Sequence, residues 1–200
     1  MPVSKKHKFK FIHIPKTGGS SVEIVFNLQH KENLYVPRFT HKIEGCIFAP
    51  QHFTHSLVNS FSPEFKDYFS FTIVRNPYTR TISEYFYINK NFYGKNIKNF
   101  NEQEFNNWLD SSLIKFDMDH KLPQVAFLDT PVDMTLRFEN LKEDWERLNK
   151  HLKTNLRLVH DNPSPLDKEE IAASLSRETK LKIYHIFEED FKKLNYEKSI

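Results

Sequence analysis

The sequence predicts an α/β domain with a central, largely parallel sheet flanked by helices. Segments with the apolar pattern of strands alternate with segments of helical periodicity along the 200 residues. One strand segment, Tyr68–Val74, is nearly continuous in aromatic and β-branched residues, which is typical of a strand buried on both faces. The length suits one domain, and we expect residues 1–200 to form it as a single unit.

The first predicted elements lie on either side of a glycine-containing turn. We expect a strand from about Lys8 to Ile14 and a helix from about Ser20 to Gln29. A second, short apolar segment, Cys46–Ala49, is expected to be a strand, and it precedes Pro50-Gln51-His52. A short helix is expected before the turn at Ser62-Pro63.

The strand Tyr68–Val74 leads into the best-marked helix of the sequence. Asn76 is a good N-cap and Pro77 a good first helical residue, so we expect a helix from Pro77 to about Phe92. A further helix is expected over residues 101–116, and Met134–Phe138 is expected to form another strand.

Helices close the chain. An amphipathic helix is predicted by apolar residues at i, i+4, i+7 and i+11, namely Leu141, Trp145, Leu148 and Leu152. Two more helices are expected over residues 167–175 and 177–194. We expect their charged residues, including Lys168 and Glu169, to form a solvated face.

Composition excludes several classes of protein. The net charge of +3, from 29 basic and 26 acidic residues, suits a small anionic ligand and does not indicate a nucleic-acid binder. The only cysteine, Cys46, excludes an intrachain disulfide and a cysteine-based metal cluster. No apolar run approaches the roughly 20 residues of a membrane-spanning helix, and the basic N-terminus leads into a strand. We therefore expect a soluble, cytoplasmic protein.

The turn Lys16-Thr17-Gly18-Gly19-Ser20-Ser21 has the residues of an anion site. A strand, a glycine turn and a helix N-terminus present backbone N–H groups, which glycine lets a phosphate approach closely. Lys16 adds a full charge, and the hydroxyl residues add donors. The purely structural alternative is a capping box formed by Ser20 and Glu23.

This turn differs from the phosphate-binding loop of ATP-dependent enzymes. In that motif the lysine follows a glycine, and a later strand supplies an acid for Mg²⁺. Here Lys16 precedes Gly18 and Gly19, and the strand Tyr68–Val74 ends in Arg75. The sequence therefore has the phosphate-binding turn but lacks the residues that would hold Mg²⁺, and this disfavours phosphoryl transfer from MgATP.

Arg75 is a second candidate anion ligand. Its planar guanidinium suits a phosphate, and Ser83 lies two turns into the following helix, where its hydroxyl would serve the same anion. The structural alternative is that Arg75 pairs with an acidic neighbour while Ser83 only packs. Ligands of parallel sheets bind beyond the carboxyl ends of the strands, which is where both the lysine–glycine turn and Arg75 are expected.

Together, the segments IPKTGGSS and VRNPYTRTISEY resemble the PAPS-dependent sulfotransferases, especially their carbohydrate, 2-O-sulfotransferase-like branch. Weaker similarities in KLPQ, LRFENLKEDWERL and IYHIFEEDFKKLNY extend the resemblance over nearly the whole chain. It implies a P-loop-like three-layer fold, 3′-phosphoadenosine 5′-phosphosulfate (PAPS) as the donor, and no metal. It also implies a hydroxyl-bearing acceptor, a glycan or glycosylated metabolite; the charge and hydropathy described above give the expectation of no nucleic-acid partner and no membrane span.

The resemblance further implies roles for individual residues. Lys16 would stabilise the leaving group, and Arg75 with Ser83 would hold the 3′-phosphate. The implied base is His52, with His55 in reserve and His120 among the remaining histidines. The implied donor-binding residues are Lys16, Thr17, Gly18, Gly19, Ser20, Ser21, Arg75 and Ser83.

Other functions stay open at this point. A P-loop nucleotide kinase would require Mg²⁺, and a non-catalytic member of the same fold would bind nucleotides or sulfated glycans without turnover. His52 and His55 are spaced as metal ligands on a helix can be, but without an evident third ligand we expect no metal site. We expect the acceptor near loops 30–45, 93–101 and 114–124, and the adenine under residues 162–166.

Overall fold

A computed structural model describes residues 2–28, 46–112, 119–159 and 166–199. These residues form two compact units, which we describe separately. The first unit comprises Met1–Val74 and Gln124–Asp161, and the second comprises Arg75–Pro123 and Asn162–Ile200. The expectation that the whole chain forms a single domain stays a prediction.

The first unit contains a four-stranded sheet in the order β1-β2-β3-β4. β2 (Phe9–Ile12), β3 (Phe69–Val74) and β4 (Met134–Arg137) are parallel, and the short β1 (Val3–Ser4) pairs antiparallel with β2. In the register, Ile12 lies opposite Thr72, and Ile73 lies opposite Leu136. The predicted α/β class with a largely parallel sheet is confirmed.

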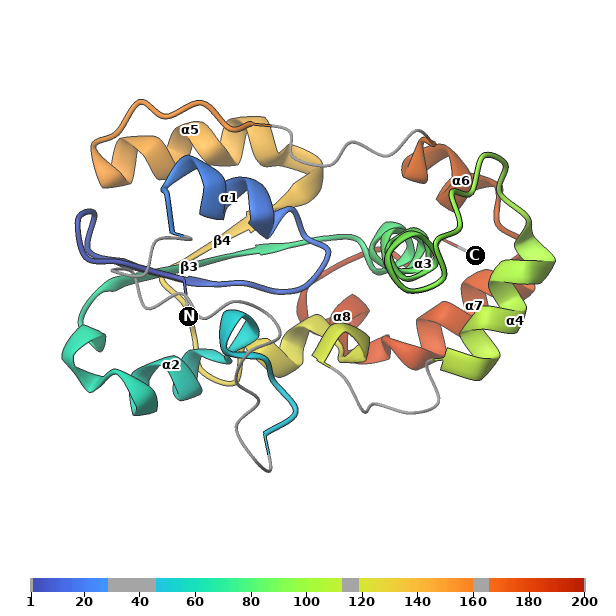
Figure 1. Ribbon diagram of the computed structural model, residues 1–200, viewed down its shortest axis with the longest axis horizontal. Coiled ribbons are helices and arrows are strands. Elements are labelled where there is room, and N and C mark those ends of the chain that lie inside the picture. Colours follow the sequence, from blue (N-terminus) through green and yellow to red (C-terminus); the bar gives the residue numbers. More distant parts are fainter. Residues whose placement is uncertain (1, 29–45, 113–118, 160–165, 200) are drawn as a thin grey trace. The chain divides into compact units, whose positions relative to one another are not determined.

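Helices cover both faces of this sheet, giving three layers. Figure 1 shows α1 (Gly19–Val25) and α5 (Leu141–Leu152) on one face and α2 (His55–Phe61) on the other. Because side chains alternate along a strand, one sheet face is apolar and packs on α1 and α5; the core residues are Phe9, Phe11, Val22, Phe26, Phe71, Ile73, Leu136, Trp145 and Leu148. On the opposite face the Lys10 ammonium donates to Asn59 of α2 at 2.7 Å.

The second unit is helical. It consists of α3 (Pro77–Phe92), α4 (Glu102–Ser112), α6 (Lys168–Ser174), α7 (Arg177–Ile186) and α8 (Glu188–Lys193). Its core joins aromatic rings of α3 and α4, which meet edge-on, to apolar residues of the last three helices. It includes Tyr85, Phe105, Trp108, Ile171, Ile183 and Phe191.

Short 3₁₀ helices connect these elements. They are η2 (Pro50–His52), η3 (Pro63–Phe65), η4 (Asp119–Lys121), η5 (Gln124–Phe127) and η6 (Phe138–Asn140). Of these, η2 and η4 carry three of the histidines and acids considered below.

The helix Pro77–Phe92 matches its prediction at both ends. The Asn76 side chain accepts a hydrogen bond from the N–H of Tyr78, and Pro77 is the first helical residue. By contrast, Cys46–Ala49 is not a strand, and this prediction was wrong. Among the described residues, β1 pairs with the outer edge of β2 instead.

The other differences are changes of length. α1 ends at Val25 rather than near Gln29, because Asn27 has a left-handed backbone with φ of 51°. The single helix expected over residues 177–194 is interrupted at Phe187, whose buried ring belongs to the core of the second unit.

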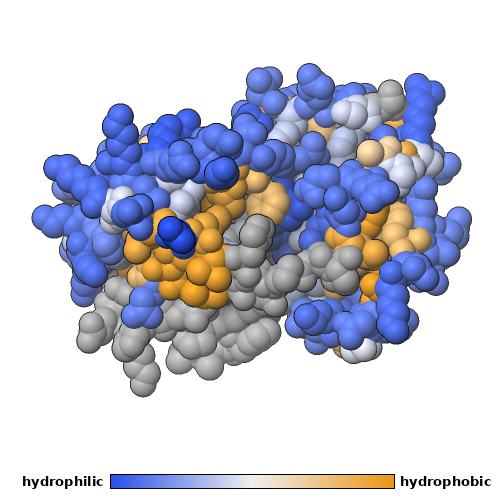
Figure 2. All heavy atoms as spheres, turned by 90° about the horizontal axis from the view of Figure 1, so that it is seen from above, coloured by the Kyte–Doolittle hydropathy of each residue, from blue (hydrophilic) through white to orange (hydrophobic). Residues whose placement is uncertain are grey.

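The surface carries apolar side chains among mainly hydrophilic ones, as Figure 2 shows. The most exposed large apolar side chains of the described residues are Ile24, Ile47, Phe61, Phe92, Tyr93 and Val159. Among the helices that the structure describes, none combines the length and the hydropathy that crossing a membrane requires.

Candidate functional site

The turn after β2 holds the lysine–glycine motif. β2 ends at Ile12 and α1 begins at Gly19. Lys16 and Gly18 have left-handed backbones, with φ of 67° and 89°, so the chain reverses within a few residues. The Thr17 hydroxyl donates a hydrogen bond to the carbonyl oxygen of Ile14 at 2.9 Å. That hydroxyl proton therefore serves the turn itself.

The structure explains why both positions are occupied by glycine. Gly18 is the N-cap of α1, and its φ of 89° disfavours any residue with a Cβ. A Cβ on Gly19 would lie 2.2 Å from Cδ2 of His13, which is far inside van der Waals contact. The capping-box interpretation is wrong, since no side chain caps α1 and Glu23 bonds elsewhere. The two glycines let the turn close over the ring of His13.

A buried hydrogen-bonded network lies against this turn. Nδ1 of His13 is 2.6 Å from Oε1 of Glu23, and Nε2 of Gln51 donates to both carboxylate oxygens of Glu23 at 3.0 Å. Burial alone would raise the pKa of Glu23, but the charge and hydrogen bonds of His13 and Gln51 lower it overall. A buried, ionised Glu23 therefore fixes the position of His13 under Gly19.

His52, the predicted base, belongs to the same cluster. Its side chain is buried, and its ring meets the ring of His13 edge-on, with 4.9 Å between centroids and an interplanar angle of 89°. Since His13 also packs against Gly19, a single imidazole ring lies between His52 and the glycine turn. Within the first unit, the structure thus brings His52 next to the lysine–glycine motif.

His55 has different neighbours. Its Nδ1 is 2.9 Å from the hydroxyl oxygen of Thr130. Burial, followed by the charge of Lys10, lowers the pKa of His55. These contacts attach His55 to the loop before β4, so the geometry favours His52 over His55 as the histidine beside the turn.

Arg75 and Ser83 lie on one side of α3 in the second unit. Nε of Arg75 donates to the hydroxyl of Thr79 at 2.9 Å. Thr79 and Ser83 are four residues apart in the helix, so their side chains lie on the same face, one turn from each other. Arg75 follows directly after Val74, the last residue of β3, as predicted for the second anion ligand.

Arg75 also pairs with an acidic residue of α6, as its structural alternative expected, although the sequence had not indicated which residue. Its guanidinium is 3.3 Å from Oε1 of Glu169, and the Glu169 side chain is 60% exposed. Burial, with the positive charge of Arg75, lowers the pKa of Lys168 to about 8. The prediction of a solvated face was therefore wrong for Lys168, which is partly buried, and holds for the exposed Glu169. The interpretation holds for the exposed pairs Glu188–Lys192 and Glu189–Lys193.

A second buried cluster joins Arg80, Glu84 and His120. Arg80 donates to the carbonyl oxygens of His120 at 3.3 Å and of Leu122 at 3.0 Å, so it holds η4 against α3. Nδ1 of His120 is 2.9 Å from Oε2 of Glu84.

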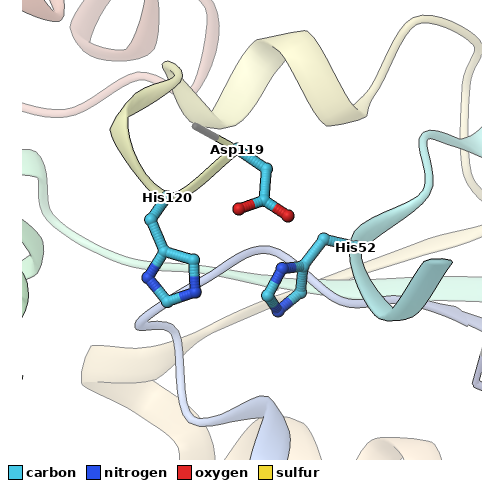
Figure 3. A group of neighbouring side chains, drawn as sticks. All are labelled: His52, Asp119 and His120. Atoms are coloured by element: carbon cyan, nitrogen blue, oxygen red, sulfur yellow. The ribbon is translucent and has the colours of Figure 1, made fainter. Parts of the chain in front are cut away.

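Figure 3 shows three side chains of metal-ligating type. Asp119 and His120 are neighbours on η4 in the second unit, whereas His52 ends η2 in the first. Each is therefore considered with its own unit, and we assign no metal site to these described residues. The expected acceptor loop 30–45 and most of the expected adenine loop 162–166 lie outside the described residues.

The lysine–glycine turn and Arg75 both fall within the part of the chain that one family profile matches. The profile of the sulfotransferase family covers residues 1–197. No curated protein and no solved structure matches the chain. Since the family match spans nearly all of the 200 residues, the chain belongs to the sulfotransferase family.

Proposed function

We propose that this sulfotransferase takes its sulfuryl group from PAPS and transfers it to a hydroxyl of a carbohydrate. The observation that carries the proposal is the lysine–glycine turn between β2 and α1 in a chain of this family. The turn combines a cation, Lys16, with the glycine backbone that leads into α1 at Gly19. Such a turn suits the 5′-phosphosulfate end of the donor.

The two anionic ends of PAPS match the two groups of candidate residues. The 5′-phosphosulfate would lie against Lys16 and the residues Thr17, Gly18, Gly19, Ser20 and Ser21. The 3′-phosphate would bind the guanidinium of Arg75 and the hydroxyl of Ser83. This assignment is supported by the parallel pairing of β2 and β3, because the turn and Arg75 follow the carboxyl ends of these neighbouring strands.

The proposed reaction is a direct transfer. The acceptor oxygen attacks sulfur, a new O–S bond forms, and the bond from sulfur to the bridging 5′-phosphate oxygen breaks. His52 accepts the proton of the acceptor hydroxyl. Lys16 neutralises the negative charge that grows on the departing phosphate. His13, held by Glu23, would fix the orientation of the His52 ring through their edge-on contact.

Donor binding is tested by thermal unfolding with adenosine 3′,5′-bisphosphate, without Mg²⁺. At a hundredfold excess over the dissociation constant, a ligand adds about 2.7 kcal/mol to the stability. For a chain of this size that corresponds to a rise of about 5–11 °C in Tm. MgATP should give a much smaller rise. An unchanged Tm with the bisphosphate would contradict the proposal.

Catalysis is tested by transfer of labelled sulfate from PAPS to a panel of glycans. His52→Ala should lower turnover by about 10²–10⁴-fold and keep the thermal shift with the bisphosphate. The exposed His185→Ala is the matched control. Lys16→Ala and Arg75→Ala should also lower activity, and full activity in both would refute the assignment of the site.

The same experiments separate the alternatives. A strict requirement for Mg²⁺, with phosphate transfer from ATP, would favour a nucleotide kinase. Bisphosphate binding without turnover of any acceptor would favour a non-catalytic binding module. The absence of a required metal and a cytoplasmic location remain predictions, which metal-free activity assays and localisation of the tagged protein would test.

A further inference from the structure

The second unit contains a cavity of about 340 Å³ between α3, α4 and η4. This volume lies within the range of roughly 300–1,000 Å³ that ligand pockets occupy. The residues that line it are Glu84, Ile88, Phe92, Tyr93, Trp108, His120 and Lys121. All of them belong to the second unit, so the cavity exists within that unit alone.

The walls of the cavity are of two kinds. Three of its residues are aromatic, and two of these are unusually open to solvent: Phe92 is 53% and Tyr93 is 63% exposed. Trp108 is 9% exposed, and its indole Nε1 is buried without a hydrogen-bond partner among the described residues. A buried donor of this kind costs free energy until an acceptor reaches it.

The polar groups of the cavity carry mixed charge. Glu84 and His120 form a hydrogen-bonded pair with 2.9 Å between Oε2 and Nδ1, and Lys121 also lines the cavity. An anionic ligand would meet the carboxylate of Glu84, and a cationic one would meet Lys121. The combination favours a neutral ligand with several hydroxyl groups.

We propose that this cavity binds a neutral sugar ring of the acceptor, with the ring on the aromatic side chains and its hydroxyls toward Glu84, His120 and Trp108. The C–H bonds of a sugar carry partial positive charge and are attracted to the negative face of an aromatic ring. A sugar hydroxyl oxygen accepts the indole proton of Trp108. The inference rests on the proposed function, because it names the acceptor's chemical class and binding place.

The test is titration with methyl glycosides of glucose, galactose and N-acetylglucosamine, followed by tryptophan fluorescence and calorimetry. The chain has two tryptophans, and Trp145 donates to the Leu156 carbonyl in the other unit. A saturable fluorescence change that disappears in Trp108→Phe is therefore expected. Sorbitol, an open-chain polyol without a ring face, should give no change.

Substitution of exposed aromatic residues then tests the cavity without threatening the fold. Tyr93→Ala and Phe92→Ala should each weaken glycoside binding about two- to tenfold. Phe61→Ala removes an aromatic ring that is 51% exposed in the first unit, and it should leave binding unchanged. Equal binding in all three variants, or no saturable response to any glycoside, would overturn the proposal.

The bisphosphate distinguishes this inference from the proposed function. If it competes with the glycosides for the Trp108 signal, the cavity holds adenine and the inference fails. If the glycosides bind but the bisphosphate gives no thermal shift, the sugar site stands and the PAPS proposal fails. If the bisphosphate raises Tm but no glycoside gives a response, the PAPS proposal stands and the inference of a sugar site fails.

Discussion

Replacing Gly19 with alanine tests how tightly the turn closes over His13. The new Cβ would lie 2.2 Å from Cδ2 and 2.3 Å from Nε2 of His13, so the ring must move. Its Nδ1 is 2.6 Å from Glu23, and moving the ring weakens that contact. Overpacking costs about 1–3 kcal/mol, and a hydrogen bond to a charged group contributes about 1.5–3 kcal/mol. We expect Gly19→Ala to lower the free energy of unfolding by about 2–5 kcal/mol.

Urea denaturation of a double-mutant cycle measures this effect. In a His13→Ala background the clash is gone, and alanine is preferred to glycine inside a helix by about 0.5–1 kcal/mol. Gly19→Ala should therefore be neutral or slightly stabilising there. The same cost in both backgrounds would refute the proposed packing. Gly94→Ala is the control: its φ is 62° and a Cβ would meet no atom within 4 Å, so its cost of about 1–2 kcal/mol should not depend on His13.

Three further predictions concern the second unit. Arg80→Met should destabilise the protein by about 2–4 kcal/mol in urea denaturation, since the carbonyls of His120 in η4 and of Leu122 just after it lose their buried donor. A loss below about 0.5 kcal/mol would show that Arg80 does not hold η4. The pKa of Lys168 is lowered from 10.5 to about 8, so the unfolded chain binds more protons between these pH values and stability rises with pH there. Lys168→Met should then stabilise the protein at about pH 7 and have little effect near pH 10.5, and a gain that is the same at both pH values would contradict this. Glu169→Gln removes the ion pair between Arg75 and the exposed Glu169, so it should tighten bisphosphate binding about two- to fivefold in calorimetry. The control Glu170→Gln should leave binding unchanged. Unchanged or weaker binding in Glu169→Gln would exclude competition between Glu169 and the phosphate.

The parts of the fold that follow local rules were predictable. Asn76 and Pro77 define the start of α3 through an N-cap and a fixed φ, which depend only on neighbouring residues. β3 was predictable because its buried position requires an apolar run. Cys46–Ala49 was not predictable by the same rule, since an apolar run becomes a strand only where a sheet edge is available, and β1 pairs with that edge of β2.

In the candidate site, too, the local features were predictable from the sequence and the long-range contacts were not. The turn and Arg75 were indicated by residue type and order alone. Glu23 was not, because its spacing from Ser20 fits a helix cap, while its actual partners, His13 and Gln51, are 10 and 28 residues away. A residue just after β2, a helix residue and a 3₁₀ residue meet here only after the chain has folded.

The sequence by itself determined that this chain belongs to the sulfotransferase family and which residues are proposed to bind the anions. These features depend on glycines, a lysine and an arginine at fixed positions along the chain, and backbone chemistry imposes them locally. Only the tertiary structure decided that His13 and Glu23 support the turn, that Glu169 pairs with Arg75, and that an aromatic cavity adjoins Glu84 and His120. Those contacts join residues distant in sequence, and burial of the surrounding side chains fixes which of them meet.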